Sequence, residues 1–295
     1  MKIIECVPNV SEGRDKGKIE LMSEAIASVD GVNLLNVCID PDHNRSVFTF
    51  IGNPETIQSG ALALCDLAIS LIDMEHHEGV HPRIGAVDVV PFIPLKGADM
   101  NDAVQTARQF GCKFGAKHCI PVYFYGEAAL RPNRRELPHI RRGGYERLRS
   151  KIIEADWMPD AGECIFDPHR GAVAVGAREP LIAFNINLST TDVSIARKIA
   201  SEIRESSGGL RNVRALGLYL GSRDIAQVSM NLTNYKVTPI SKVYRAVEEK
   251  AARFGTGILE SELIGLLPED AYQDAMTGDF KIVDFGPDRI IEHYC

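Results

Sequence analysis

The chain contains no long hydrophobic run and no long run of basic residues. No apolar stretch in its 295 residues approaches the roughly 20 that a membrane-spanning helix needs. The N-terminus, Met1 to Glu5, lacks the apolar core of a signal peptide. The formal net charge is −7, which disfavours nucleic-acid binding and means that an anionic ligand would need a local basic patch. We therefore expect a cytoplasmic protein without nucleic-acid or membrane partners.

Cysteine pairs of the Cys-x-x-Cys kind are missing as well. The seven cysteines are odd in number, which is typical of reduced thiols, and we expect most of them to be small buried side chains. Cys6 and Cys38 have no activating group beside them, so a cysteine nucleophile is disfavoured. The sequence also has no Gly-rich phosphate loop, serine-nucleophile elbow or dinucleotide fingerprint.

What the chain does have is one order of elements that occurs twice. Apolar residues at helical spacing predict helices, and short apolar runs between turn residues predict strands. In the first half we predict strands 2–7, 32–38, 46–52 and 87–93 and helices 15–29 and 54–72. In the second half we predict strands 181–187, 213–220, 225–232 and 257–264 and helices 192–206 and 239–254. Residues 99–178 add a helix, a strand at 120–125, further helix and a strand near 172–177.

Two successive β-α-β-β-α-β patterns predict an α/β (α+β) fold of two ferredoxin-like subdomains, residues 1–179 and 180–295. Helices would cover one face of each sheet. On the other face, polar residues alternate along 181–187 and 225–232. This polar stripe indicates either a solvated open face or a ligand groove between the subdomains that holds an elongated polar molecule.

Residues 75–88 hold three of the chain's eight histidines, at positions 76, 77 and 81. Histidine titrates near neutrality, so the cluster suggests metal binding or proton transfer. Gly79 and Pro82 disfavour the helix that would place His77 and His81 on one face, so we expect no metal. His76 and His77 are expected to cap the end of the preceding helix. His81 is left as the candidate catalytic base.

Two further segments are candidates for ligand binding. The chain has one dense cationic patch, which indicates a solvated face or a carboxylate-binding surface. Its members are Arg131, Arg134, Arg135, His139, Arg141 and Arg142. Residues 160–171, after the only tryptophan, predict either a connecting loop or a loop that covers a ligand.

Several motifs together resemble the glutamate formimidoyltransferase family, the transferase half of formiminotransferase-cyclodeaminase. They lie at residues 5–13, 44–50, 81–94, 123–128 and 181–188, and the resemblance runs from residue 3 to the C-terminus. It implies transfer of the formimino group from N-formimino-L-glutamate to N5 of the co-substrate tetrahydrofolate in histidine breakdown. The products would be 5-formiminotetrahydrofolate and L-glutamate. The resemblance also implies two subdomains with folate between them, and a homodimer.

The same resemblance assigns roles to residues. His81 stands at the position of the family's catalytic histidine, with the proposed role of general base. The family's folate-binding segment corresponds to Gly162, Glu163, Cys164, Ile165, Phe166, Asp167, Pro168, His169, Arg170 and Gly171. Some family members carry an aspartate at the position of Cys38, so Asp40 and Asp42 become the candidates for a carboxylate that orients His81.

Three alternatives stay open. A glutamate formyltransferase that uses 5-formyltetrahydrofolate would need the same folate site and base, and a non-catalytic folate-binding protein would keep the site without the chemistry. A metal hydrolase would need a bound ion. Because the sequence ends at Cys295, we expect conversion of the product to methenyltetrahydrofolate to need a separate cyclodeaminase.

Overall fold

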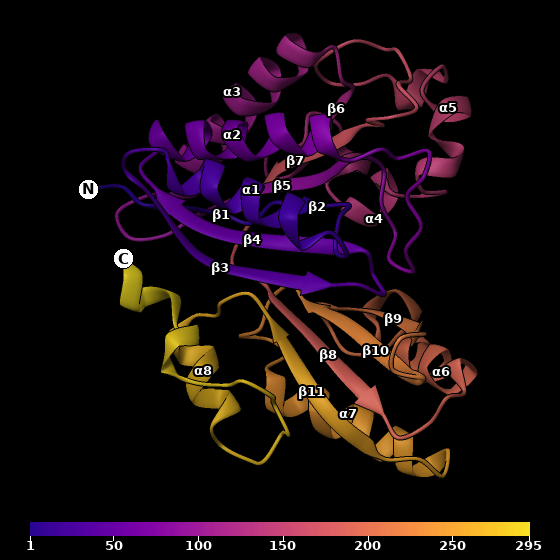
Figure 1. Ribbon diagram of the computed structural model, residues 1–295. Coiled ribbons are helices and arrows are strands. Elements are labelled where there is room, and N and C mark those ends of the chain that lie inside the picture. Colours follow the sequence, from indigo (N-terminus) through magenta and orange to yellow (C-terminus); the bar gives the residue numbers. More distant parts are fainter. The chain divides into compact units, whose positions relative to one another are not determined.

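The computed structural model describes all 295 residues, which form two compact units (Figure 1). The first unit is Met1–Arg178 together with Cys295, and the second is Glu179–Tyr294. Each unit has its own sheet and its own hydrophobic core. No helix in the structure is long and apolar enough to cross a membrane.

The first unit is built on a seven-stranded sheet. Its strands are β1 (Ile4–Cys6), β2 (Asn9–Val10), β3 (Val32–Asp40), β4 (Arg45–Gly52), β5 (Val87–Pro94), β6 (Val122–Gly126) and β7 (Val173–Ala177). β1 and β2 act as one interrupted strand, because both pair with β4 on one side and β5 on the other. The order β3-β4-β1/β2-β5 is that of a ferredoxin-like unit. β7 and β6 extend the sheet in parallel beyond β5.

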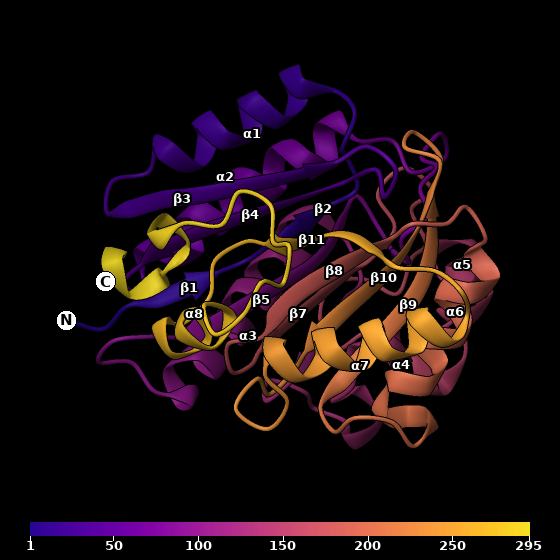
Figure 2. The same cartoon turned by 90° about the horizontal axis from the view of Figure 1, so that it is seen from below.

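Three long helices cover one face of this sheet, as Figures 1 and 2 show. They are α1 (Lys16–Ala27), α2 (Thr56–Leu71) and α3 (Met100–His118). The apolar side chains predicted from helical spacing, such as Met22 in α1 and Leu64 in α2, are buried in the core with Phe48 and Phe50 of β4. Burial of these stripes fixes the helices to the sheet.

Part of the opposite face is also covered, which the sequence did not indicate. The segment between β6 and β7, where further helix was predicted, contains the short helices α4 (Leu137–Ile140) and α5 (Leu148–Lys151). It forms a separate apolar cluster over β5, β6 and β7 that includes Val89, Tyr123 and Ile140. The first sheet is therefore covered on both faces over β5, β6 and β7.

The second unit repeats the ferredoxin-like order without an extension. Its strands β8 (Ile182–Leu188), β9 (Val213–Leu220), β10 (Ile225–Leu232) and β11 (Ile258–Ile264) lie in the order β11-β8-β10-β9, all antiparallel. Helices α6 (Val193–Ile203) and α7 (Ile240–Arg253) pack on one face, and α8 (Glu269–Ala275) follows β11. The predicted fold class, two successive ferredoxin-like subdomains, is confirmed.

Two local predictions were wrong. Helix α2 ends at Leu71, so His76 and His77 lie beyond it in an irregular loop and do not cap it. The cysteines are all free thiols, but only Cys6 and Cys65 are buried. Cys38 in β3 and Cys295 at the chain end are half-buried, and Cys112, Cys119 and Cys164 are exposed.

Candidate functional site

The candidate site of the first unit forms where the loop of residues 72–86 lies against the β3–β4 hairpin. The N–H of Val80 donates to Asp42 O (3.2 Å), and the side-chain amide of Asn44 donates to Glu78 O (2.9 Å). Gly79 passes so close to the hairpin that a Cβ there would overlap the carbonyl oxygen of His43. These contacts place His81 beside the hairpin turn.

The hairpin turn itself is held by side chains. Asp40 Oδ1 accepts hydrogen bonds from the backbone N–H groups of Asp42 (2.9 Å) and His43 (2.8 Å). Asn44 has a left-handed backbone (φ 48°), and its Oδ1 accepts from Gly13 N (3.0 Å). Asp and Asn are favoured in such turns because their short side chains bond to nearby backbone groups. The turn residues between β3 and β4 therefore fix the position of Arg45, the first residue of β4.

His81 is held in one tautomer. Its side chain is buried, with only 9% of the residue exposed. Nδ1 lies 2.9 Å from Pro82 O, and Nε2 lies 2.9 Å from Nη1 of Arg45. Because a carbonyl only accepts and a guanidinium only donates, the proton must sit on Nδ1 and the lone pair on Nε2. His81 is thus a neutral imidazole whose basic atom is Nε2.

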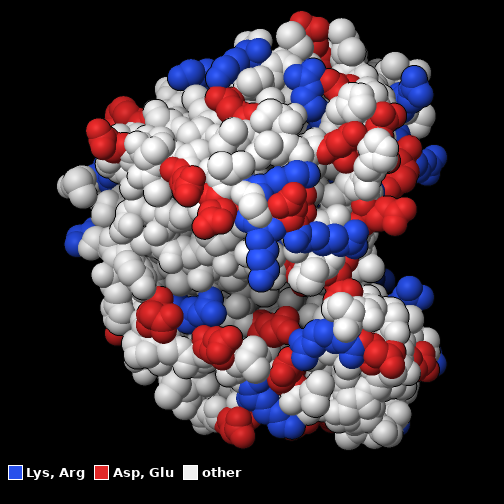
Figure 3. Space-filling view, viewed as in Figure 1, with Lys and Arg blue, Asp and Glu red and all other residues white.

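The surroundings of His81 carry excess positive charge. Burial, followed by the nearby charges of Arg45, Arg141 and His43, holds the pKa of His81 well below 6.5. The rings of His43 and His81 are 5.4 Å apart. Burial and the neighbouring Arg141 lower the pKa of Arg45 to about 10. The cationic character is local, since Lys and Arg are interspersed with Asp and Glu over the face shown in Figure 3.

Neither of the candidate carboxylates orients His81. Asp40 Oδ2 lies 3.4 Å from Nδ1 of His43, and no hydrogen bond joins Asp40 or Asp42 to His81. The nearest buried ion pair joins Asp88 to Arg141. His81 is oriented by a backbone carbonyl and an arginine instead.

The other two histidines of the loop differ from each other. His77 is buried, with Nε2 2.9 Å from Asn44 O, and its Nδ1 accepts from Nε of Arg83 (3.1 Å). It does bind a backbone carbonyl, as predicted, but one of the hairpin rather than of a helix end. His76 is exposed and pairs with Asp73 (2.8 Å). His77 is therefore a structural link between loop and hairpin.

The segment 162–171 is anchored to the loop that carries His81. His169 O accepts from Met74 N (3.0 Å), and Arg170 O accepts from Ala86 N (2.9 Å), so the segment touches that loop on both sides of His81. Gly162 has φ 75° and lies against Ile120 O too closely for any Cβ. The two ends of the segment are fixed parts of the fold.

The middle of this segment is more accessible. Ile165 is 60% exposed, and Cys164 is exposed with its Sγ donating to Ile152 O (3.1 Å). Phe166 lies with its ring 5.8 Å from that of Tyr145. Asp167 is engaged locally, because its Oδ1 accepts from His169 N (2.8 Å). Residues 162–165 are the exposed run of this segment, and residues 166–168 are half-buried.

The predicted cationic patch does not exist as one surface. Arg134 is 1% exposed and pairs with Asp160 at 2.6 Å. Arg135 pairs with Glu127 at the surface. Arg141 lies near His81, where it forms an ion pair with Asp88. Both predicted readings were wrong for Arg134, because spacing in sequence does not reveal a buried acidic partner.

A small exposed cluster lies near the same loop. The ligand atoms of Asp73, Glu75 and His169 lie within 4.8 Å of one another. Hydrogen bonds from His169 and His76 lower the pKa of Asp73 to about 2. The cluster could hold a cation, but both oxygens of Asp73 are already engaged by His76 and His169.

In the second unit, side chains of the predicted polar stripe form a hydrogen-bonded network. The amide of Gln227 donates to Asn187 Oδ1 (2.9 Å), and the amide of Asn187 donates to Glu260 Oε1 (3.1 Å) and Glu262 Oε1 (2.8 Å). Arg223 pairs with both glutamates at 2.6 and 3.0 Å. The apolar residues that alternate with this stripe are buried in the core, so the predicted alternation of β8 and β10 is confirmed.

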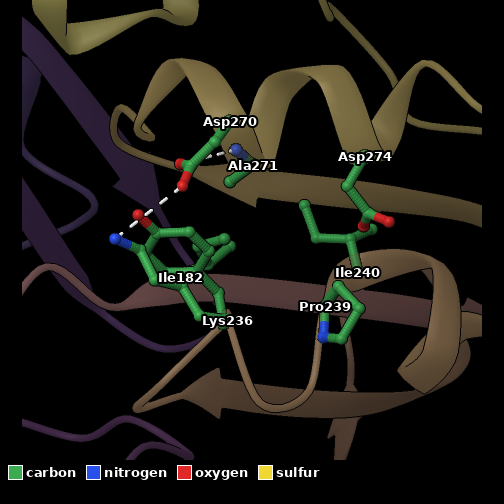
Figure 4. Close-up of a pocket in the computed structure, with 8 residues that line it drawn as sticks. Ile182, Lys236, Pro239, Ile240, Asp270, Ala271 and Asp274 are labelled. Atoms are coloured by element: carbon green, nitrogen blue, oxygen red, sulfur yellow. Dashed lines mark hydrogen bonds and ion pairs between the residues drawn. The ribbon is translucent and has the colours of Figure 1, made fainter.

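The second unit also contains a cavity of about 160 Å³ (Figure 4). Its lining residues include Lys236, Pro239, Ile240, Asp270 and Asp274. Lys236 lies 3.9 Å from Asp270, and Asp274 accepts from the backbone N–H of Ser241 in the first turn of α7 (3.0 Å). Its charged groups thus have partners within the unit.

Arg45 and His43 are the site residues that sequence reasoning missed. Arg45 appeared only within a motif of the resemblance. The available signal was the position of two basic side chains around a turn-forming Asn44, at the start of a strand that is rich in apolar residues.

The structure is thus an α/β protein with a duplicated sheet and a buried, neutral histidine in its first unit. Two family models match the chain: "Formiminotransferase domain, N-terminal subdomain" over residues 3–178 and "Formiminotransferase domain" over residues 183–282. The chain belongs to the formiminotransferase family of transferases, which confirms the resemblance seen in its motifs.

Curated relatives agree with this assignment. A glutamate formimidoyltransferase of Thermoplasma acidophilum is 45% identical, covering 99% of this chain and 97% of the relative. One of Streptococcus pyogenes is 40% identical, covering 96% and 95%. The formimidoyltransferase-cyclodeaminase of Rattus norvegicus is 44% identical over 93% of this chain but only 52% of the rat protein.

Proposed function

We propose that this chain is a glutamate formimidoyltransferase. It transfers the formimino group of N-formimino-L-glutamate to N5 of tetrahydrofolate and gives 5-formiminotetrahydrofolate and L-glutamate in histidine degradation. The observation that carries the proposal is the full-length similarity to two enzymes of that name. A neutral histidine in a cationic site supports it, because the reaction needs a base and both substrates are carboxylates.

In this mechanism His81 moves one proton twice. Nε2 of His81 accepts the proton of N5 while N5 forms its bond to the formimino carbon. The imidazolium then returns the proton to the glutamate nitrogen as the bond between that nitrogen and the formimino carbon breaks. The lowered pKa of His81 keeps the base form present at neutral pH and makes the imidazolium a good acid for the second step.

We assign folate binding to residues 162–171. The support is their attachment to the loop of His81 on both sides and the exposed apolar surface of Ile165. Ile165→Ser should raise the KM for tetrahydrofolate and leave the KM for the formimino donor unchanged. An unchanged KM for tetrahydrofolate would exclude Ile165 from the folate site.

The deciding experiment is a transfer assay with tetrahydrofolate and N-formiminoglutamate, run beside N-formylglutamate. We expect transfer from the formimino donor and undiminished turnover after EDTA treatment, since no step above uses a metal. Preferred transfer from N-formylglutamate would make the chain a formyltransferase. Folate binding without any transfer would make it a non-catalytic folate-binding protein.

We further propose that the enzyme is a cytoplasmic homodimer whose product is consumed by a cyclodeaminase activity distinct from the site described here. Sedimentation equilibrium tests the dimer, which should give twice the 32.4 kDa of one chain. A single species at the chain mass would exclude it.

A further inference from the structure

Arg45 differs from Arg134 and Arg141 of the first unit because it has no carboxylate partner. Arg134 pairs with Asp160 at 2.6 Å, and Arg141 pairs with Asp88. The guanidinium of Arg45 forms its hydrogen bonds only with the ring of His81, and its Nε is buried without any partner. A buried cation without a counter-ion is costly, so its charge is expected to meet an anion in the working protein.

The nearby carboxylates are engaged elsewhere. Asp88 pairs with Arg141 and accepts from Ile84 N (3.0 Å). Asp40 holds the hairpin turn through the backbone N–H groups of Asp42 and His43. The two acids therefore match the two arginines, Arg45 and Arg141, in number, but both acids are engaged by other groups and neither forms an ion pair with Arg45.

The contact between Arg45 and His81 also blocks the base. Nη1 of Arg45 donates to Nε2, the one atom of His81 that can accept a proton. An arginine cannot take up a proton, so it cannot relay one from a substrate. While this hydrogen bond stands, His81 cannot act.

We propose that Arg45 binds a carboxylate of the amino-acid-derived donor, and that capture of this carboxylate removes Arg45 from Nε2 of His81. The inference rests on the proposed function and deepens it, because it names the group that recognises the donor. The planar guanidinium matches a carboxylate with two parallel hydrogen bonds, which are stronger than one bond to an imidazole. Donor binding thus frees the base.

This arrangement makes the base depend on its substrate. Before the donor binds, Nε2 is capped and the cations around His81 keep it neutral. After the donor binds, Nε2 is free and the charge of Arg45 is neutralised by the carboxylate, so the affinity of His81 for a proton rises. Arg45 is then both the receptor for the donor and the positioning residue for His81.

The test uses the complete protein labelled with ¹⁵N-histidine, and L-glutamate, the product dicarboxylate, as the probe. In the native protein, saturating L-glutamate should raise the pKa of His81 by about one unit or more, followed through its ring nitrogens by NMR. His81→Gln assigns the signals. In Arg45→Met the pKa should already be higher without ligand, and L-glutamate should no longer change it.

Calorimetry gives a second readout. Arg45→Met should weaken L-glutamate binding about 10- to 100-fold, as expected for loss of a charged hydrogen-bonded pair. Arg45→Lys, which keeps the charge but not the planar fork, should fall between the two. The matched control is Arg253→Met, which removes an arginine from the exposed surface of α7 and should leave binding unchanged.

Specific outcomes would overturn the proposal. Native affinity for L-glutamate in both Arg45→Met and Arg45→Lys would exclude Arg45 as the receptor, and Arg45→Lys keeps this test available if Arg45→Met does not fold. An equal response of the His81 pKa in native protein and Arg45→Met would exclude the release step. Failure of the transfer assay with an intact L-glutamate response would reject the proposed function and leave the binding role of Arg45 standing.

Discussion

The two units contain the same hairpin with different chemistry at its end. In the first unit, β3 and β4 are joined by residues 41–44, and the backbones of Asp40 and Arg45 face each other in the strand register. In the second, β9 and β10 are joined by residues 221–224, and Leu220 pairs with Ile225. The last turn residue is left-handed in both, with φ 48° at Asn44 and 51° at Asp224. The two turns therefore share the left-handed backbone conformation at their last residue.

The arginine at each hairpin shows the difference. Arg223 of the second turn pairs with Glu260 and Glu262 of β11, whereas Arg45 pairs with no acid. A neutralised arginine holds strands together, and an arginine without an acid is available to a ligand. Both units thus place an arginine at the end of the same hairpin. Whether that arginine has a structural or a ligand-binding role depends on whether a neighbouring residue supplies a carboxylate.

The largest effect expected from this rule concerns a fully paired arginine. Arg134→Met leaves Asp160 buried without its cation, so the free energy of unfolding should fall by about 3–5 kcal/mol. Urea unfolding measures this, with the surface variant Arg135→Met as the control that should change little. A loss in Arg134→Met below about 1 kcal/mol would contradict a structural role for the buried pair.

The second effect concerns the site beside the arginine that has no acid. His81→Ala should lower turnover roughly 100-fold or more, about 2.7 kcal/mol in the barrier, because the reaction loses its base. The control is His76→Ala, an exposed histidine of the same loop, which should keep native turnover. Steady-state rates decide, and native turnover in His81→Ala would show that another group is the base.

The third effect is a dependence of stability on pH. Because the native pKa of His81 lies well below 6.5, the unfolded chain binds more protons below about pH 6.5. Stability should therefore fall as the pH drops from 6.5 toward the native pKa, by up to about 1.4 kcal/mol per pH unit for this residue. Urea unfolding at several pH values should show a smaller slope in His81→Asn. An identical slope would mean that the pKa of His81 is not lowered in the native state.

The smallest effect concerns the second hairpin. Arg223→Met removes a partly exposed ion pair, so the free energy of unfolding should fall by less than about 1 kcal/mol, and less still at high salt. Thermal unfolding at two salt concentrations measures both changes. A large, salt-independent loss would show that the second arginine is not simply a surface pair.

The order of elements could be predicted because each helix and strand carries its own apolar period, as in α2 and β10. His81 could be proposed because Gly79 and Pro82 shape its loop locally. The properties of Arg134 and Arg45 could not be predicted, since one depends on a distant acid and the other on having none. Both are properties of three-dimensional neighbourhoods.

Asn44 links the loop that carries His81 to the β3–β4 hairpin. Its side chain joins Gly13, Glu78 and its own turn, which are far apart in sequence. Loops are ordinarily the places where a chain tolerates insertions and drifts in sequence. A residue inserted into 78–81 would displace His81 from the hairpin and leave the hydrophobic cores intact. Activity in this fold therefore depends on the length of a segment that has no regular secondary structure.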